Sequence, residues 1–268
     1  MVSTTHSGAP ATASQLSAPS LSIRGLSKSF GAKTVLHDID LEVSPGQFVA
    51  LVGRSGAGKS TLLRLINGSH RPTSGSVTVL GTDPAACRRR ELQRLRSRVG
   101  FIFQQFGLVG RLSALENVLM GALGALRMPR YGVGSYPRAL RERAAEQLER
   151  VGLADERFQR CDTLSGGQQQ RVAIARTLLQ EAEIVLADEP VASLDPTASV
   201  SVLAMLRELS AEDGFTVICS LHQVDLALQV SDRIVAVRDG AVILDAPTSE
   251  TTEDQLRAVY RAVEASGT

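Results

Sequence analysis

A glycine-rich run near the start of the chain places the tightest limit on its fold. Residues 53–60 read GRSGAGKS and fit the pattern G-x-x-x-x-G-K-[ST]. The preceding QFVALV is typical of a strand, and the following TLLRLING is typical of a helix. In such a loop the glycines let backbone N–H groups converge on phosphate oxygens, and the helix adds its positive N-terminal end. The alternative is a glycine-rich turn that fits the pattern by coincidence, which average residue usage predicts in about one chain per hundred.

The same loop predicts where a nucleotide and its metal ion would be held. Lys59 would neutralise the β- and γ-phosphates, and the Ser60 hydroxyl would hold Mg²⁺. The residues predicted to bind the nucleotide in this loop are Gly53, Arg54, Ser55, Gly56, Ala57, Gly58, Lys59, Ser60 and Thr61.

An apolar segment further along the chain ends in two carboxylates. Residues 184–189 read IVLADE, which indicates a buried strand followed by Asp188 and Glu189. Ligands bind at the carboxyl ends of strands in open α/β sheets. Asp188 would therefore hold Mg²⁺, and Glu189 would accept a proton from an attacking water. Taken alone, the pair is more typical of a solvated turn, but together with the glycine-rich loop it indicates a P-loop NTPase.

The order of predicted elements favours an α/β fold. Residues 21–52 read as strands joined by turns, and strand and helix patterns alternate from residue 164 onward, which favours a mostly parallel sheet. Between about residues 88 and 163, arginine-rich helical segments surround one strand and a Gly/Pro-containing hinge near 121–137, as expected of an inserted helical lobe. The predicted division is a disordered tail (1–20), a main domain (21–250) and a C-terminal polar helix or tail (251–268).

Bulk properties narrow the possible partners. The formal net charge is +1, so no global field draws the chain to nucleic acid, and none is expected as a partner. The cysteines, Cys87, Cys161 and Cys219, are far apart and lack metal-ligand spacing, which suits a reducing compartment. No stretch of sequence reaches the ~18 apolar residues that span a bilayer, and the first residues do not resemble a secretory signal. We therefore expect a soluble, cytoplasmic protein unless a partner docks it to a membrane.

A second anion-binding pattern distinguishes among P-loop NTPases. Residues 164–168 read LSGGQ directly before a strong helical pattern, and serine followed by two glycines at a helix start makes another site for an anion. These fixed positions would coincide by chance in roughly a few chains per ten thousand. From about residue 21 to 245 the sequence resembles the ATP-binding-cassette (ABC) family. The resemblance implies a RecA-like P-loop core with a mostly parallel sheet, an antiparallel β subdomain and an inserted α-helical subdomain.

The resemblance also implies roles for residues outside the glycine-rich loop. Phe30 matches the aromatic residue that stacks on adenine, although a phenylalanine of the core is an alternative interpretation. Gln104 matches the glutamine that contacts Mg²⁺ and senses a membrane partner, and His222 matches the histidine that contacts the γ-phosphate. Asp195, in Ser-Leu-Asp, matches the loop that crosses between two ATPase subunits. The signature residues implied to bind ATP are Ser165, Gly166, Gly167 and Gln168.

The family resemblance implies an assembly as well as a reaction. In this family two subunits pair head to tail, and each ATP lies between one chain's glycine-rich loop and the other chain's LSGGQ. The implied partners are a second copy of the chain, transmembrane permease subunits and, indirectly, an extracytoplasmic substrate-binding protein. The implied cofactors are ATP and Mg²⁺, and the implied catalytic residues are Lys59, Glu189 and His222. The implied location is the cytoplasmic side of the cell membrane, held there peripherally.

Two segments bear on the transported molecule. FQQFGLVGRLSALENVLMGALG and DEPVASLDP look like the ATPase subunits of phosphonate importers. Gly107 and Ala182 depart from that subfamily, in which asparagine and proline are expected, and neither position has a chemical role. The alternatives are an importer for polar amino acids or phosphate and a lipoprotein-releasing exporter. A cassette acting on DNA or ribosomes would need a long coiled coil or a second cassette, and a P-loop kinase has no use for LSGGQ.

Overall fold

A mixed β-sheet forms the centre of the computed structural model, which describes residues 18–126 and 132–261. Its strand order is β5-β6-β7-β3-β8-β9. Every neighbouring pair in it is parallel except β8 and β9, so the predicted mostly parallel sheet is confirmed. The strands are β3 (Phe48–Val52), β5 (Val99–Ile102), β6 (Ile184–Asp188), β7 (Thr216–Leu221), β8 (Arg233–Arg238) and β9 (Ala241–Pro247).

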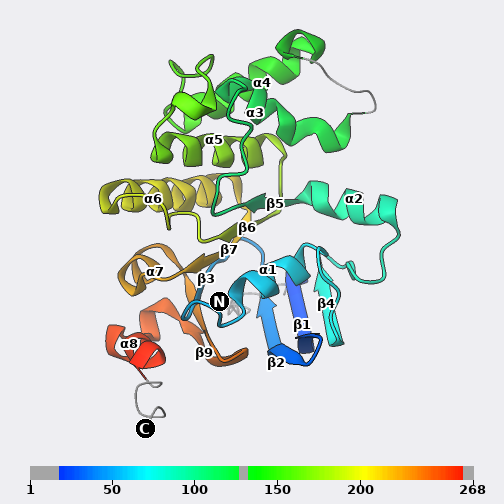
Figure 1. The fold of residues 1–268 in the computed structure, drawn as a ribbon, viewed down its shortest axis with the longest axis vertical. Coiled ribbons are helices and arrows are strands. Elements are labelled where there is room, and N and C mark those ends of the chain that lie inside the picture. Colours follow the sequence, from blue (N-terminus) through cyan, green and yellow to red (C-terminus); the bar gives the residue numbers. More distant parts are fainter. Residues whose placement is uncertain (1–17, 127–131, 262–268) are drawn as a thin grey trace, which may run out of the picture.

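A second, antiparallel sheet packs beside the first, as the family resemblance implies (Figure 1). Its order is β2-β1-β4, with strands β1 (Leu21–Phe30), β2 (Lys33–Val43) and β4 (Ser74–Val79). Ser20, within the stretch predicted to be a disordered tail, is buried, and its Oγ lies 3.2 Å from Thr216 Oγ1. Residues 1–17 of that predicted tail lie outside the described residues.

The side chains of the central strands alternate between two apolar cores, as the period of a strand requires. Val49 and Leu51 of β3 face a core shared with the antiparallel sheet and helix α1 (Lys59–Ile66). Phe48, Ala50 and Val52 face the opposite core, which is covered by the later helices. Helix α1 therefore lies between the two sheets, directly after the glycine-rich loop (Figure 1).

Helical elements occupy most of the stretch predicted to be an inserted lobe. They lie together in the upper part of Figure 1, apart from α2, which extends to the side. Part of the predicted hinge, residues 127–131, lies outside the described residues. The elements are α2 (Arg89–Arg98), α3 (Ala114–Leu119), η1 (Met120–Ala125), η2 (Val133–Ser135), α4 (Arg138–Arg150), η3 (Cys161–Thr163) and α5 (Gly166–Leu179).

The remaining helices cover the central sheet towards the C-terminus. They are α6 (Pro196–Asp213), α7 (Val224–Val230), η4 (Thr248–Glu250) and α8 (Glu253–Arg261). Helix α8 lies within the stretch predicted to be a C-terminal polar helix, and the residues after 261 lie outside the described part. Across the described ranges, no helix is both long and apolar enough to cross a membrane.

Candidate active site

The glycine-rich loop joins β3 to α1 in a conformation that only glycine tolerates at two positions. Gly53 has φ 152°, and a Cβ there would lie 2.1 Å from the Val237 carbonyl oxygen. Gly58, the residue before α1, has φ 105°, and its Cβ would lie 2.6 Å from Leu36 Cδ2. Both φ values are costly for residues with a Cβ, and at Gly53 the neighbouring atom also belongs to the backbone, so the first and last glycines of the motif follow from the loop's conformation. The first turn of α1 also presents backbone N–H groups that have no partner within the helix.

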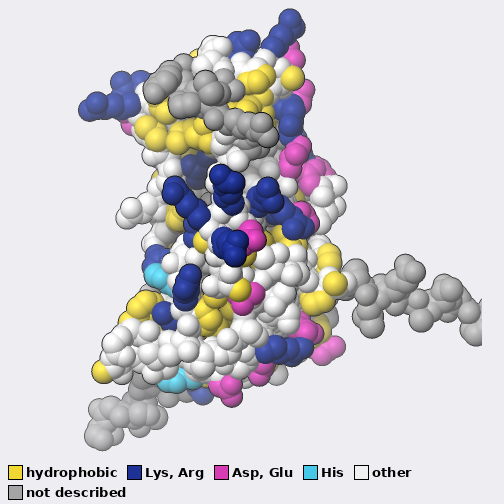
Figure 2. All heavy atoms as spheres, turned by 90° about the vertical axis from the view of Figure 1, so that its right-hand side faces the viewer, with side chains coloured by type: hydrophobic (Ala, Val, Ile, Leu, Met, Phe, Trp, Pro, Cys, Tyr) yellow, Lys and Arg dark blue, Asp and Glu magenta, His cyan; other side chains and the backbone are white. Residues whose placement is uncertain are grey.

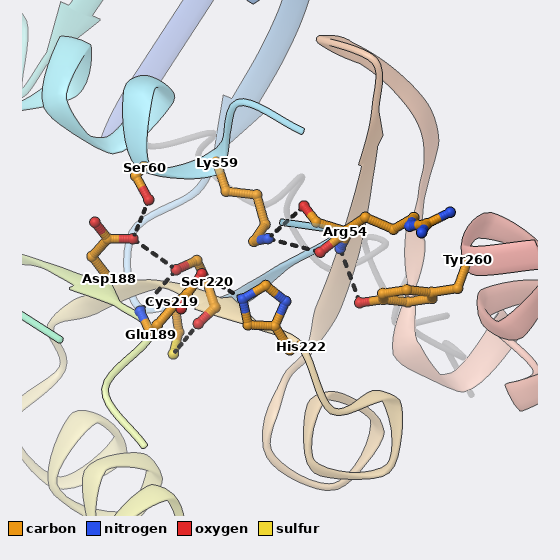
Figure 3. Close-up of polar contacts among 10 residues, drawn as sticks. Arg54, Lys59, Ser60, Asp188, Glu189, Cys219, Ser220, His222 and Tyr260 are labelled. Carbon is orange, nitrogen blue, oxygen red and sulfur yellow. Dashed lines mark hydrogen bonds and ion pairs between the residues drawn. The ribbon is translucent and has the colours of Figure 1, made fainter. Parts of the chain in front are cut away.

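Lys59 is folded back over this loop. Its side chain is buried, and Nζ donates to the carbonyl oxygens of Gly53 at 2.7 Å and Arg54 at 3.2 Å (Figure 3). Burial lowers the pKa of the Lys59 ammonium, and the carboxylates of Glu189 and Asp188 act in the opposite direction. The loop therefore concentrates a partly desolvated cation and backbone donors in one place, which is an environment for phosphate.

Ser60 and Asp188 come together although they are far apart in the sequence. Ser60 Oγ donates to Asp188 Oδ1 at 2.8 Å, and Asp188 is buried at the end of β6. Ser220, on the neighbouring strand β7, donates from its Oγ to the same carboxylate oxygen at 3.1 Å. A hydroxyl and a carboxylate are hard oxygen ligands of the kind Mg²⁺ uses beside nucleotide phosphates, so this donor set fits that ion.

Glu189 directly follows β6 in a left-handed conformation, with φ 50°. Its backbone N–H donates to Ser220 Oγ at 2.9 Å, so one serine hydroxyl contacts both acidic residues. The Glu189 carboxylate Oε1 contacts His222 Nε2, and the imidazole lies just past the end of β7 (Figure 3). Two of the three predicted catalytic side chains, Glu189 and His222, are therefore in direct contact at the carboxyl edge of the sheet.

Phe30 and Gln104 are both exposed, and they lie at the ends of other strands. The Phe30 ring at the end of β1 is 46% exposed, which excludes the alternative of a core phenylalanine. It meets the edge of His70 at 5.3 Å between centroids, and Lys28 Nζ lies 4.7 Å from its centroid. Gln104 follows β5, the neighbour of β6, and no hydrogen bond joins it to Ser60 or Asp188 within the described ranges.

The LSGGQ segment begins α5 and lies away from the glycine-rich loop of its own chain. Ser165 caps the helix: its Oγ accepts from the Gln168 N–H at 3.3 Å, and Gln168 Oε1 accepts from the Ser165 N–H at 3.0 Å. A Cβ on Gly166 would lie 3.2 Å from Leu194, next to Asp195, which caps α6 through the Ala198 N–H at 2.9 Å. In Figure 1 the start of α5 is separated from α1 by the central sheet.

Sequence reasoning missed two residues of this site. Ser220 could have been suspected, because it stands two positions before His222 in an apolar segment typical of a strand. Tyr260 had no such signal: it comes from α8, and its hydroxyl accepts from the Gly53 N–H at 3.1 Å (Figure 3). Only the docking of α8 brings it to the loop.

A family model described as "ABC transporter" matches residues 36–192. The chain belongs to the ABC transporter family. This confirms the family predicted from GRSGAGKS and LSGGQ, the P-loop ABC ATPase fold, and an ATP-binding ATPase as the kind of enzyme.

Curated relatives of this ABC ATPase match over nearly the whole chain. "Phosphonates import ATP-binding protein PhnC" of Frankia casuarinae is 54% identical over 239 residues, which are 89% of this chain and 94% of the relative. "Phosphate-import ATP-binding protein PhnC" of Mycolicibacterium smegmatis is 53% identical over 241 residues, 90% of this chain and 92% of the relative. The two names differ in the transported anion, so similarity alone does not separate the two cargoes.

A solved structure supports the same fold for this ABC ATPase. It is the dimeric post-hydrolysis state of the ATP-binding cassette MJ0796 bound to ADP and Pi, which is 34% identical with a TM-score of 0.74. The match covers 85% of this chain and 98% of that chain. That protein is a dimer in the solved structure.

Proposed function

We propose that this ABC ATPase is the ATP-hydrolysing subunit of an importer that takes up phosphonates or related phosphorus oxyanions through a separate membrane permease. One observation carries the catalytic part of the proposal. Lys59, the Ser60–Asp188 pair and the Glu189–His222 pair come from three separate segments and meet at one edge of the sheet. A buried lysine at the start of α1 thus lies beside two carboxylates and a histidine at the ends of β6 and β7.

Each of these residues would have a separate role in ATP hydrolysis. Glu189 would accept the proton of the attacking water, because its carboxylate is oriented by His222 and its backbone is held by Ser220. Lys59 would neutralise charge on the transferred phosphoryl group, and His222 would contact the γ-phosphate. Ser60 and Asp188, with Gln104 beyond β5, would hold Mg²⁺, which would supply positive charge against the phosphates.

A second copy of the chain would complete each ATP site. Ser165 and the glycines after it make an anion-binding helix start, yet they lie apart from Lys59 in the same chain (Figure 1). Head-to-tail pairing would bring LSGGQ of one chain to the glycine-rich loop of the other, with Asp195 near the crossing and Phe30 stacked on adenine. The dimeric state of the similar solved cassette supports this arrangement.

A hollow beside α2 is where we place the permease. It has a volume of about 820 Å³ and combines apolar and cationic side chains. Figure 2 shows arginine and hydrophobic side chains gathered on this side of the molecule. Arg176 in its lining donates to the carbonyl oxygens of Gly107 and Phe106, just after Gln104. A segment seated here could therefore move the loop that follows β5 and carries Gln104. Docking would place the ATPase on the cytoplasmic side of the membrane, and the substrate-binding protein would act on the far side.

The role of Glu189 is tested by Glu189→Gln in the purified chain. We expect MgATP affinity within a few-fold of wild type and a loss of turnover on the order of a hundredfold or more, because a positioned base contributes about that much. Glu208→Gln, an exposed glutamate on α6, is the matched control and should hydrolyse ATP normally. Turnover of Glu189→Gln within a few-fold of wild type would remove Glu189 from the role of base.

The cargo is tested by growth of a strain lacking this gene on 2-aminoethylphosphonate, on orthophosphate at limiting concentration, and on abundant orthophosphate. Loss of growth on the phosphonate alone, restored by wild type but not by Glu189→Gln, would support phosphonate import. Loss at limiting orthophosphate alone would assign phosphate instead, as in the name of the Mycolicibacterium relative. Normal growth on all three would contradict both cargoes.

A further inference from the structure

A tyrosine near the C-terminus contacts the first residue of the phosphate-binding loop. The hydroxyl of Tyr260, on α8, accepts a hydrogen bond from the Gly53 N–H at 3.1 Å (Figure 3). The two residues are separated by 207 positions, so the contact depends on the packing of the C-terminal helix. No motif identified in the sequence contains Tyr260.

The residue that Tyr260 contacts is held from both sides. While the Gly53 N–H bonds to Tyr260, the Gly53 carbonyl oxygen accepts from Lys59 Nζ at 2.7 Å. Gly53 also lies so close to Val237 that a Cβ would meet its carbonyl oxygen at 2.1 Å. The Tyr260 hydroxyl therefore acts on the entry to the loop and, through one residue, on the lysine that faces the phosphates.

Helix α8 is anchored firmly enough to hold this hydroxyl in place. Leu256 is fully buried and Val259 is 6% exposed, and both belong to the core that covers the sheet. The helix packs on α7 and β8, and α7 begins two residues after His222. Burial raises the pKa of the Tyr260 phenol, against the effect of the Gly53 hydrogen bond, so the hydroxyl stays neutral at physiological pH.

We propose that Tyr260 is a positioning residue of the nucleotide site, which orients the Gly53 peptide and so makes the C-terminal helix part of the ATP-binding loop. This inference rests on the proposed function only in that GRSGAGKS holds the phosphates. It predicts that the hydroxyl, not the ring, sets part of the affinity for nucleotide, since the ring packs whether or not the oxygen is present.

The test compares Tyr260→Phe with Val259→Ala in the full-length chain. Tyr260→Phe removes only the oxygen, whereas Val259→Ala removes apolar packing from the same helix and leaves the hydroxyl. MgATP dissociation constants are measured by isothermal titration calorimetry, and melting temperatures are measured without nucleotide. We expect Tyr260→Phe to weaken MgATP binding about two- to tenfold, the worth of one neutral hydrogen bond, and to lower the melting temperature, because the buried Gly53 N–H loses its acceptor. Val259→Ala should lower the melting temperature as well but leave the affinity nearly unchanged.

The outcomes separate this inference from the proposed function. If wild type binds MgATP and Lys59→Ala does not, while Tyr260→Phe binds as tightly as wild type, the role of Tyr260 is overturned and the ATP site stands. A loss of affinity that tracks the loss of melting temperature equally in both helix variants would make Tyr260 merely structural, which also overturns it. If wild type itself does not bind MgATP, the proposed function fails first.

Discussion

Ser220→Ala tests whether one buried hydroxyl holds both acidic residues of the site. Ser220 is fully buried, its Oγ donates to Asp188 Oδ1 at 3.1 Å, and it accepts from the Glu189 N–H at 2.9 Å. Alanine removes a hydrogen bond to a charged group and leaves a backbone N–H without its acceptor. Each loss costs about 1–3 kcal/mol, and because they share one atom we expect a total of about 2–4 kcal/mol. That is a large fraction of the ~5–15 kcal/mol that holds a typical domain folded.

The catalytic consequence follows from the backbone of Glu189. Its positive φ is unfavourable for a residue with a side chain, by roughly 1–2 kcal/mol, and the hydrogen bond to Ser220 opposes relaxation. Without that bond the Glu189 carboxylate should shift relative to His222. A misplacement of about 1 Å can cost on the order of a hundredfold in rate, so turnover should fall by at least about tenfold.

Urea unfolding and steady-state ATP hydrolysis measure the two effects. The chain has no tryptophan, so far-UV circular dichroism is the suitable probe. With a slope of about 2–3 kcal/mol/M, the unfolding midpoint should fall by about 1 M. Ser210→Ala is the matched control: Ser210 is also buried, but its Oγ donates to the Arg207 carbonyl in its own helix. A loss no larger than in Ser210→Ala, or full ATPase activity, would refute the reasoning.

Three other predictions concern Lys59, Gly53 and the cysteines. Lys59→Met should change the free energy of unfolding without nucleotide by less than about 1 kcal/mol, because burial disfavours the charged ammonium and lowers its pKa. Thermal-shift measurements should show that MgATP no longer stabilises the variant. Gly53→Ala should abolish ATP binding in calorimetry even where the chain folds, because the new Cβ would lie 2.1 Å from the Val237 carbonyl oxygen. Iodoacetamide at pH 8 should modify Cys87 and spare Cys161, whose thiol pKa burial raises to about 11, as peptide mass spectrometry would show; equal labelling of both would contradict this.

The local parts of the site are readable in the sequence because their physics is local. A phosphate-binding loop needs consecutive backbone donors at a strand-to-helix junction, so GRSGAGKS can be recognised in the sequence without any tertiary information. The same holds for LSGGQ, whose serine and glutamine cap one helix reciprocally. The alternation of strand and helix indicated a mostly parallel sheet for a similar reason, since parallel strands need crossover connections.

Other parts depended on which segments pack together. The sequence by itself was enough to predict which residues the site would contain. It predicted a lysine and a serine in the glycine-rich loop and two carboxylates after an apolar strand, and the order of motifs in the ABC family indicated Gln104 and His222. Only the tertiary structure decided that Ser220 bridges Asp188 and Glu189, because that contact requires β6 and β7 to be neighbours. The tertiary structure also decided that Tyr260 contacts Gly53 and that LSGGQ lies apart from the glycine-rich loop of its own chain. Such contacts join residues far apart in the chain, and their geometry comes from core packing, which leaves no pattern in any single segment.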